Sequence, residues 1–435
     1  MLFIRFLLFL SLILSFQWKA AAQEGSTTTD EVADSSSIQP SPTPVTADVI
    51  TETSIPILPS PDVAPPSAVI EDAQGPPNSA STPPEVTPEP SPVFVHPVVT
   101  PEPTAVPPVT SGENSGSVKF VDAEWSSQAN YPLPLLESAG GMLRTKDGKN
   151  LLMVAGGYFD NADLHTTKEA YVLNVDEEKG VWERVPDMPR HLTHCAQVLV
   201  EDRMYLCGGF LSKAPGRSVG SCYMFSYGER KWETIPKLPL AVGGGGMVYI
   251  SQLDSLLFSS GMIRQQDEWH GIDSTHSYML DLKNMGAGWV RKADIPNPRN
   301  HMSGVSVLGR YFFVGGQKGA DEESGNQRSV HEYDYSNDKW IEKESIPVPL
   351  GHISASTFQY GRGFITVAGI TDGRRPIAKV HYYDAVKNIW SELGFYPRQV
   401  QSVVCGPSND AIHCSTGRGF PGDASQSYFR RLSTE

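Results

Sequence analysis

The feature that most limits the fold of this chain is a repeat of about 50 residues, which runs through its last three quarters. Six short apolar runs each end in glycine, and the final glycines are 52, 52, 55, 53 and 48 residues apart. The runs are 151–157, 204–209, 256–261, 311–316, 364–369 and 411–417. A run of this length that ends in a turn signal is typical of a fully buried strand. We therefore expect six equivalent β-units, which bury their apolar faces against one another.

A second series of residues follows the same period with an offset. Six of the eight tryptophans are spaced 57, 50, 57, 51 and 50 residues apart, namely Trp125, Trp182, Trp232, Trp289, Trp340 and Trp390. Between each glycine run and the next tryptophan lies a tyrosine-containing segment such as 170–173 or 278–281. Chance would not place six tryptophans in register, so the repeat is structural.

This pattern resembles the kelch repeat, in which an apolar strand ends in Gly-Gly and is followed by a tyrosine strand and a tryptophan. The resemblance implies an all-β fold, a β-propeller of four-stranded blades related to the central domain of galactose oxidase. It covers residues 118–435 and predicts six blades. The sequence departs from the pattern at Ser260, Ala368 and Thr416, which replace the first glycine of the doublet.

The ends of the repeat predict how the ring of blades closes. The repeat begins with a tryptophan segment, 118–131, and ends after a tyrosine segment, 427–432. We therefore expect the N-terminal strand to complete the last blade, which hides the edge strands and ties the two ends together.

The residues before the repeat predict export from the cytosol. Residues 1–22 combine an apolar run with the end Ala20-Ala21-Ala22, which indicates a cleaved signal peptide, although an uncleaved anchor stays open. Residues 23–117 hold thirteen acidic residues, no Lys or Arg, and twenty prolines. Such a Pro/Ser/Thr-rich segment cannot bury enough apolar surface to fold, so we expect a disordered acidic arm that spaces the propeller.

Charge and hydropathy narrow the classes of partner. The whole chain has a formal net charge of −14. Residues 118–435 contain 33 basic and 36 acidic residues, so the net charge of this part is only −3. No basic run suggests nucleic acid, and no segment after the signal peptide is long and apolar enough to span a membrane. We expect a secreted, monomeric protein that needs no cofactor and whose partner is an extracellular glycan or protein.

The connections within each unit predict which face of the propeller carries function. The connections after the glycines are the long ones, namely 158–169, 210–221, 262–275, 317–329, 370–378 and 418–426. In an up-and-down blade these loops share one face with the blade-to-blade connections, and we call it the long-loop face. Loops on a rigid scaffold usually carry the binding residues.

A set of polar residues is expected at the mouth of the central channel on that face. Twelve residues after each tryptophan, where the innermost strand begins, stand Glu137, His194, Gly244, His301, His352 and Ser402. The candidate ligand-binding residues are Glu137, His194, His301 and His352, with Arg190, Arg299, Asn300, Gln317 and Arg398 beside them. They could bind a sugar or an acidic group, or they could be the hydrogen-bonding groups that kelch repeats carry for structure. We expect no metal, because the blades need not bring three of the nitrogens to one ion.

Two further features lie outside the repeat register. Trp269, in the longest loop, is a candidate anchor for a sugar ring or a protein partner, or it packs on the neighbouring loop. Of the five cysteines, Cys405 and Cys414 flank a turn and could form a disulfide across a hairpin. The other three are expected to be small buried apolar residues.

Enzymatic alternatives within the same family are less favoured. Galactose oxidases have a Tyr-His pair at their copper and seven blades, whereas this sequence has no such dipeptide and six repeats. The bacterial N-acetylneuraminate epimerases are similar in blade number, but this chain lacks their long insertion. A sugar isomerase or mutarotase using His194, His301 or His352 as acid and base remains an alternative. A structural matrix or cell-wall protein, acting through the arm, is another.

Overall fold

The structure is a computed structural model that describes residues 117–320 and 324–434. The predicted signal peptide and all of the predicted arm except Ser117 lie outside the described residues, so both stay predictions. Within the described residues the fold is all-β, with a single short 3-10 turn, η1 (Met285–Ala287). No helix in these residues is long and apolar enough to cross a membrane.

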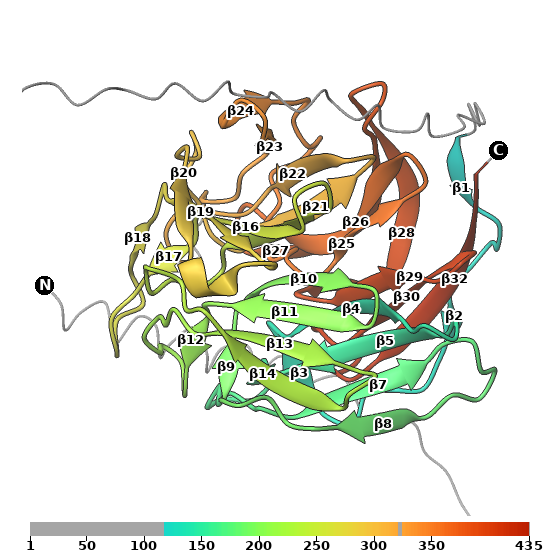
Figure 1. The fold of residues 1–435 in the computed structure, drawn as a ribbon. Coiled ribbons are helices and arrows are strands. Elements are labelled where there is room, and N and C mark those ends of the chain that lie inside the picture. The colour runs from blue at the N-terminus through green and yellow to red at the C-terminus, as the bar shows by residue number, and fades with distance from the viewer. Residues whose placement is uncertain (1–116, 321–323, 435) are drawn as a thin grey trace, which may run out of the picture. The chain divides into compact units, whose positions relative to one another are not determined.

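In the described part of the chain, six antiparallel sheets form the blades of a propeller, as the repeat predicts (Figure 1). Blade 1 consists of β4 (Ala139–Arg144), β5 (Asn150–Ala155), β7 (Ala170–Asn174) and β8 (Trp182–Val185). Blade 2 consists of β10 (Ala196–Val200), β11 (Arg203–Cys207), β13 (Cys222–Ser226) and β14 (Lys231–Ile235). Blade 3 consists of β15 (Gly246–Ile250), β16 (Ser255–Ser259), β19 (Ser277–Asp281) and β20 (Val290–Lys292).

The last three blades follow the same order from the innermost strand outwards. Blade 4 consists of β21 (Ser303–Val307), β22 (Arg310–Val314), β23 (Val330–Asp334) and β24 (Lys339–Glu342). Blade 5 consists of β25 (Thr357–Tyr360), β26 (Gly363–Thr371), β27 (Arg375–Asp384) and β28 (Ile389–Gln401), with β31 (Arg418–Phe420) at the end of β28. Blade 6 consists of β29 (Val404–Pro407), β30 (Ala411–Ser415), β32 (Ser427–Thr434) and β1 (Val118–Phe120), while β2 (Ser126–Ser127) also pairs with β32.

Blade 6 confirms the predicted closure, because it takes three strands from the C-terminal end and its outer strand from the N-terminal end. Val118 pairs with Thr434 and Phe120 with Leu432. Figure 1 shows β1 and β32 side by side. The sheet that would otherwise end in the unpaired edge of β32 is thereby completed.

Short two-stranded ribbons lie on the long-loop face. They are β3 (Leu135–Leu136) with β6 (Tyr158–Phe159), β9 (Leu192–Thr193) with β12 (Phe210–Leu211), and β17 (Met262–Ile263) with β18 (Ile272–Asp273). The opposite face carries the short turns that follow each innermost strand, such as 201–202 and 308–309, and we call it the short-turn face. Each innermost strand therefore runs from the long-loop face to the short-turn face.

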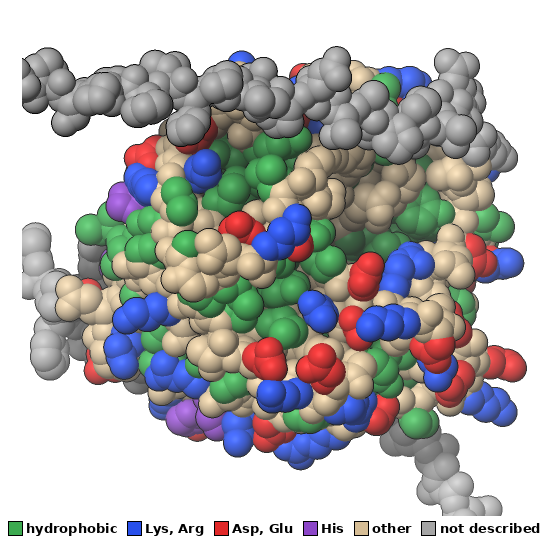
Figure 2. Space-filling view, in the orientation of Figure 1, with side chains coloured by type: hydrophobic (Ala, Val, Ile, Leu, Met, Phe, Trp, Pro, Cys, Tyr) green, Lys and Arg blue, Asp and Glu red, His purple; other side chains and the backbone are tan. Residues whose placement is uncertain are grey.

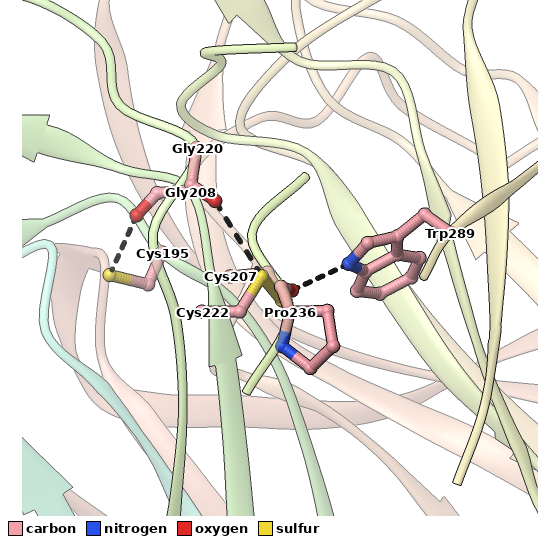
Figure 3. Close-up of a disulfide and its surroundings, with 7 residues drawn as sticks. All are labelled: Cys195, Cys207, Gly208, Gly220, Cys222, Pro236 and Trp289. Carbon is pink, nitrogen blue, oxygen red and sulfur yellow. Dashed lines mark hydrogen bonds between the residues drawn. A yellow bond between two sulfur atoms is a disulfide. The ribbon is translucent and has the colours of Figure 1, made fainter. Parts of the chain in front are cut away.

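The tryptophans link each blade to the one before it. The indole Nε1 of Trp182 donates to the carbonyl of Ala129 at 2.8 Å, and that of Trp289 donates to Pro236 at 2.7 Å (Figure 3). The other four make the equivalent bond, Trp125 to Phe395, Trp232 to Pro186, Trp340 to Ala293 and Trp390 to Glu344. The register of the tryptophans in the sequence thus reflects one repeated contact between blades.

Candidate functional site

The six residues that follow the tryptophans by twelve positions meet around the propeller axis. Each lies just before an innermost strand in the left-handed region, with φ between 52° and 70°. We call this set the axial ring: Glu137, His194, Gly244, His301, His352 and Ser402. Backbone bonds join neighbours in the ring, from His194 N–H to the Glu137 carbonyl at 3.3 Å and from Gly244 N–H to the His194 carbonyl at 2.8 Å.

Glu137 is the centre of the polar contacts in the axial ring. Its Oε1 accepts hydrogen bonds from His352 Nδ1 and Ser402 Oγ, and its Oε2 lies 3.6 Å from His194 Nε2. Burial alone would raise the pKa of this carboxyl, but the charges of His352 and His194 and the bond from His352 outweigh burial and hold the pKa well below its usual range. The carboxylate is therefore charged inside the protein.

The three imidazoles contact one another in a row, His194 edge-on to His301 and His301 tilted against His352. The ring centroids of His194 and His301 are 4.6 Å apart, and those of His301 and His352 are 4.1 Å apart. Tyr158 and Phe210, the first residues of two long loops, pack edge-on against His194. The row of imidazoles thus reaches from blade 2 to blade 5.

The axial ring is packed shut. Glu137, His301, His352 and Ser402 are between 3% and 6% exposed, and the side chain of His194 is 8% exposed. The sequence placed these residues together but did not show whether they line an open pocket. In the structure they close the long-loop end of the channel.

The predicted arginines do not converge on the axial ring. Arg299 is fully buried, and its guanidinium donates to the carbonyls of Gly315, Asn297 and Phe313. Arg398 is also buried and donates to the carbonyls of Pro421, Gly419 and Gly422. Arg190 is half-buried, with Ser221 Oγ 3.3 Å from its Nη1. These side chains bond to turns and connections, and their part in ligand binding stays a prediction.

Of the remaining candidate residues, two are buried beside the axial ring and one is exposed. Asn300 adjoins the axial ring, because its Oδ1 bonds to His301 Nδ1. Gln317 is 2% exposed, and its backbone pairs with that of Asn300. Trp269 is 52% exposed, away from the axis in the loop between β17 and β18. The structure thus brings Glu137, the three histidines and Asn300 together and leaves Trp269 apart.

A cavity that the sequence did not predict occupies the axis on the other side of the axial ring. It has a volume of about 360 Å³ and is lined by residues from β4, β10, β15, β21, β25 and β29. Its walls reach the exposed residues Arg144, Glu201 and Gln359, so it opens on the short-turn face. Figure 2 shows a hollow within the ring of blades on the face turned to the viewer. Gly140 and Gly304 lie on its innermost strands, but an added Cβ there would clash with a backbone oxygen, so these glycines mark close packing and did not indicate the cavity.

One amide spans the cavity near the axial ring. Gln197 Nε2 donates to the Gly140 carbonyl at 2.6 Å and lies 3.5 Å from the Ser354 carbonyl, while its Oε1 accepts from Gly140 N–H at 2.5 Å. It joins blades 1, 2 and 5 at the wall of the cavity.

Blade 2 and blade 6 each contain one disulfide. Cys405 and Cys414, the pair suggested by the sequence, are bonded across β29 and β30. Cys207 and Cys222 are bonded across β11 and β13 (Figure 3), so these two are not the isolated apolar residues that the sequence suggested. Cys195 is buried and free, and burial raises the pKa of its thiol to about 12.

Comparison with known proteins agrees with the fold. The family model described as the Kelch motif matches residues 191–239, which span the end of one repeat and most of the next. This match and the relatives below support a kelch-repeat family for the chain. The kelch propeller is similar to the solved structure of YjhT, with a TM-score of 0.55 and 11% identity over 71% of this chain and 100% of that one. A likeness at this identity shows the fold alone.

Curated relatives match parts of the kelch propeller. Kelch-like protein 41a of Danio rerio is 27% identical over 44% of this chain and 30% of its own length. Beta-scruin of Limulus polyphemus is 22% identical over 54% of this chain and 25% of its own length. N-acetylneuraminate epimerase of Vibrio cholerae is 33% identical over 19% of this chain and 22% of its own length. The chain thus spans less than a third of the length of these relatives.

Proposed function

We propose that the propeller is an extracellular recognition module that binds a protein partner through its long-loop face. The observation that carries this proposal is the exposed pair Trp269 and Ile272, which are 52% and 73% exposed on the β17–β18 ribbon. Exposed aromatic side chains at defined positions are the usual anchors of protein interfaces. Kelch propellers generally act as protein-binding modules, which supports the same conclusion.

The loop that carries Trp269 is held in place by its neighbour. Asp267 N–H donates to the Pro215 carbonyl at 3.1 Å, and Arg217 N–H lies 3.4 Å from Gln266 Oε1. At the base of the loop, Arg264 is 8% exposed, donates to the Gly216 carbonyl and stacks on Phe210 at 3.6 Å. A held loop loses little conformational entropy on binding, which favours affinity.

The two disulfides support the extracellular assignment. Disulfides persist in oxidising compartments and are rare in the cytosol. Both bonds join directly opposed residues of neighbouring strands, Cys207 with Cys222 and Cys405 with Cys414. The predicted signal peptide is independent support from the sequence.

A glycan is the second candidate partner. A specific observation favours it, since 85 residues of the chain are 33% identical to an N-acetylneuraminate epimerase. Trp269 could stack on a sugar ring as readily as on a protein. Catalysis by His194, His301 and His352 is less favoured, because all three are buried in the axial ring. The matrix-protein alternative rests on the arm and stays a prediction.

The experiment is a parallel screen of the purified protein on an array of extracellular proteins and on a glycan array. The screen is repeated with Trp269→Ala and with Leu308→Ala, a matched control that is 59% exposed on the short-turn face. We expect a protein hit that weakens at least tenfold in Trp269→Ala and is unchanged in Leu308→Ala. A hit only on the glycan array would replace the protein partner by a sugar. A hit insensitive to Trp269→Ala would contradict the proposed face.

A further inference from the structure

Three side chains of the axial ring converge as the ligands of one ion would. One ligand atom from each of Glu137, His194 and His301 lies within 4.8 Å of the other two, and all three residues are buried. They come from blades 1, 2 and 4, so the convergence is a property of the whole ring rather than of one loop. We propose that the axial ring binds one divalent transition-metal ion, held by the Glu137 carboxylate and the Nε2 atoms of His194 and His301.

The hydrogen bonds around His194 fix which of its nitrogens faces Glu137. Thr193 Oγ1 has one hydrogen and donates it to the Glu137 carbonyl at 2.9 Å. Its contact of 2.9 Å with His194 Nδ1 must therefore be one in which Nδ1–H donates. The second ring proton of the charged imidazole is then on Nε2, the atom that lies 3.6 Å from Glu137 Oε2. A metal ion would displace this proton and bind the Nε2 lone pair.

His301 is fixed in the same way by a different neighbour. The amide nitrogen of Asn300 donates to Asp273 Oδ1 at 2.6 Å and to the Gly319 carbonyl at 2.9 Å, which assigns its oxygen to the contact with His301. The Nδ1 of His301 therefore donates to Asn300 Oδ1, and the lone pair of the neutral ring is on Nε2. A metal-binding histidine typically donates its other ring N–H to an oxygen in this manner.

Glu137 is the third ligand of the proposed site. One of its carboxylate oxygens is held by hydrogen bonds, and the other faces His194. Its Oε1 accepts from His352 Nδ1 and Ser402 Oγ, so these two residues orient the carboxylate. Its Oε2 faces His194. A ligating carboxylate whose second oxygen is held by hydrogen bonds is the expected arrangement around a protein-bound metal.

The donor set indicates the class of ion. Two imidazole nitrogens and one carboxylate oxygen suit Zn²⁺ and neighbouring first-row metals, whereas Ca²⁺ and Mg²⁺ prefer oxygen ligands throughout. In a tetrahedral site with bonds of about 2.0–2.2 Å, ligand atoms are roughly 3.5 Å apart, so modest side-chain rotations would bring the three atoms into range. The bound ion would join blades 1, 2 and 4 at the axis.

The test measures metal binding by the full chain. Protein is stripped with EDTA, dialysed and titrated with Zn²⁺ against a chromophoric chelator, and the bound metal is counted by mass spectrometry. We expect one Zn²⁺ per chain at micromolar concentration and a rise in melting temperature, because the ion binds only the folded ring. A folded protein that retains no Zn²⁺ at micromolar concentration would overturn the proposal.

Variants locate the ion. Glu137→Gln keeps the shape of the side chain but removes its charge, and His301→Asn removes a nitrogen ligand, so each should weaken binding at least tenfold. His270→Ala, an exposed histidine in the Trp269 loop, is the matched control and should bind as the original protein does. If His301→Asn does not fold, Glu137→Gln decides, and Co²⁺ absorption in the unmodified protein reports nitrogen and oxygen ligands directly. Undiminished binding by folded Glu137→Gln would overturn the assignment.

Discussion

At the scale of the residue, three buried histidines away from the axis are held neutral. Burial lowers the pKa of His331, His381 and His413 to about 4 in each case. Two of them lie edge-on to tryptophans of the repeat, His331 against Trp340 and His381 against Trp390. In the unfolded chain the same side chains titrate near pH 6.5.

These histidines predict a loss of stability on mild acidification. As the pH falls from 6.5 towards 4, the unfolded chain binds protons that the folded protein does not, so the free energy of unfolding decreases. At pH 5 each histidine would contribute a loss of about 2 kcal/mol relative to pH 7.5. Urea unfolding of His381→Gln at both pH values should show a fall about 2 kcal/mol smaller than in the original protein. Equal falls in the two proteins would contradict a neutral His381.

The conformations of single residues explain where the sequence departs from the kelch pattern. The first position of each glycine doublet has φ between 55° and 71°. Ser260 and Ala368 adopt this conformation at a cost of roughly 1–2 kcal/mol, and the β-branched Thr416 is more strained. The second position has φ between 90° and 113°, a region open to glycine, and all six repeats keep glycine there. The repeat therefore predicted the backbone, including the place of the axial ring, from the residues alone.

The side chains of the site were harder to predict. His301 and Arg299 are two residues apart, yet one joins the axial ring and the other donates to backbone carbonyls. Position in the repeat does not specify a rotamer, because the rotamer depends on the neighbouring blade. Likewise, the pairing of Cys207 with Cys222 depends on the register of β11 and β13 across a long loop, whereas Cys405 and Cys414 are joined by a short turn.

At the scale of the element, closure of blade 6 depends on apolar packing more than on charge. Trp125 packs against Phe120 and Tyr396, with ring centroids 5.6 and 5.0 Å apart, and its indole donates to Phe395. The ion pair of Asp122 with Arg431 crosses the same junction, but the side chain of Arg431 is 54% exposed. Exposed ion pairs contribute little to stability.

This comparison predicts unequal effects of two substitutions at the junction. Trp125→Ala should lower the free energy of unfolding by about 2–4 kcal/mol, because it removes an aromatic side chain and a hydrogen bond. Asp122→Ala should leave the free energy of unfolding nearly unchanged. Denaturant unfolding of both variants measures the difference, and a larger loss from Asp122→Ala would reverse our account of the closure.

Each disulfide joins two strands of one blade, so its removal should lower the free energy of unfolding. Replacing Cys207 and Cys222 by serine, or Cys405 and Cys414 by serine, should lower the free energy of unfolding by about 2–3 kcal/mol on loop-closure grounds. Peptide mapping without reduction should find both pairs, with Cys195 as the free thiol. Finding Cys195 in a disulfide would contradict the pairing.

At the scale of the whole molecule, the two faces of the propeller differ in what they offer a partner. The long-loop face presents Trp269 and Ile272 on a held ribbon, while the channel beneath that face is closed by the axial ring. The short-turn face opens onto the axial cavity. The sequence predicted that both the binding residues and a polar pocket lie on the long-loop face. In the structure Trp269 lies on that face, whereas the axial cavity opens on the short-turn face.

The central claim is that the propeller binds its partner through the long-loop face. The most direct test is to measure amide hydrogen exchange of the propeller with and without the partner that the array identifies. Our account predicts slower exchange in residues 264–273 on binding, with the short turns around Arg144 and Glu201 unchanged. Protection of those short turns, with 264–273 unaffected, would contradict the account and move recognition to the axial cavity.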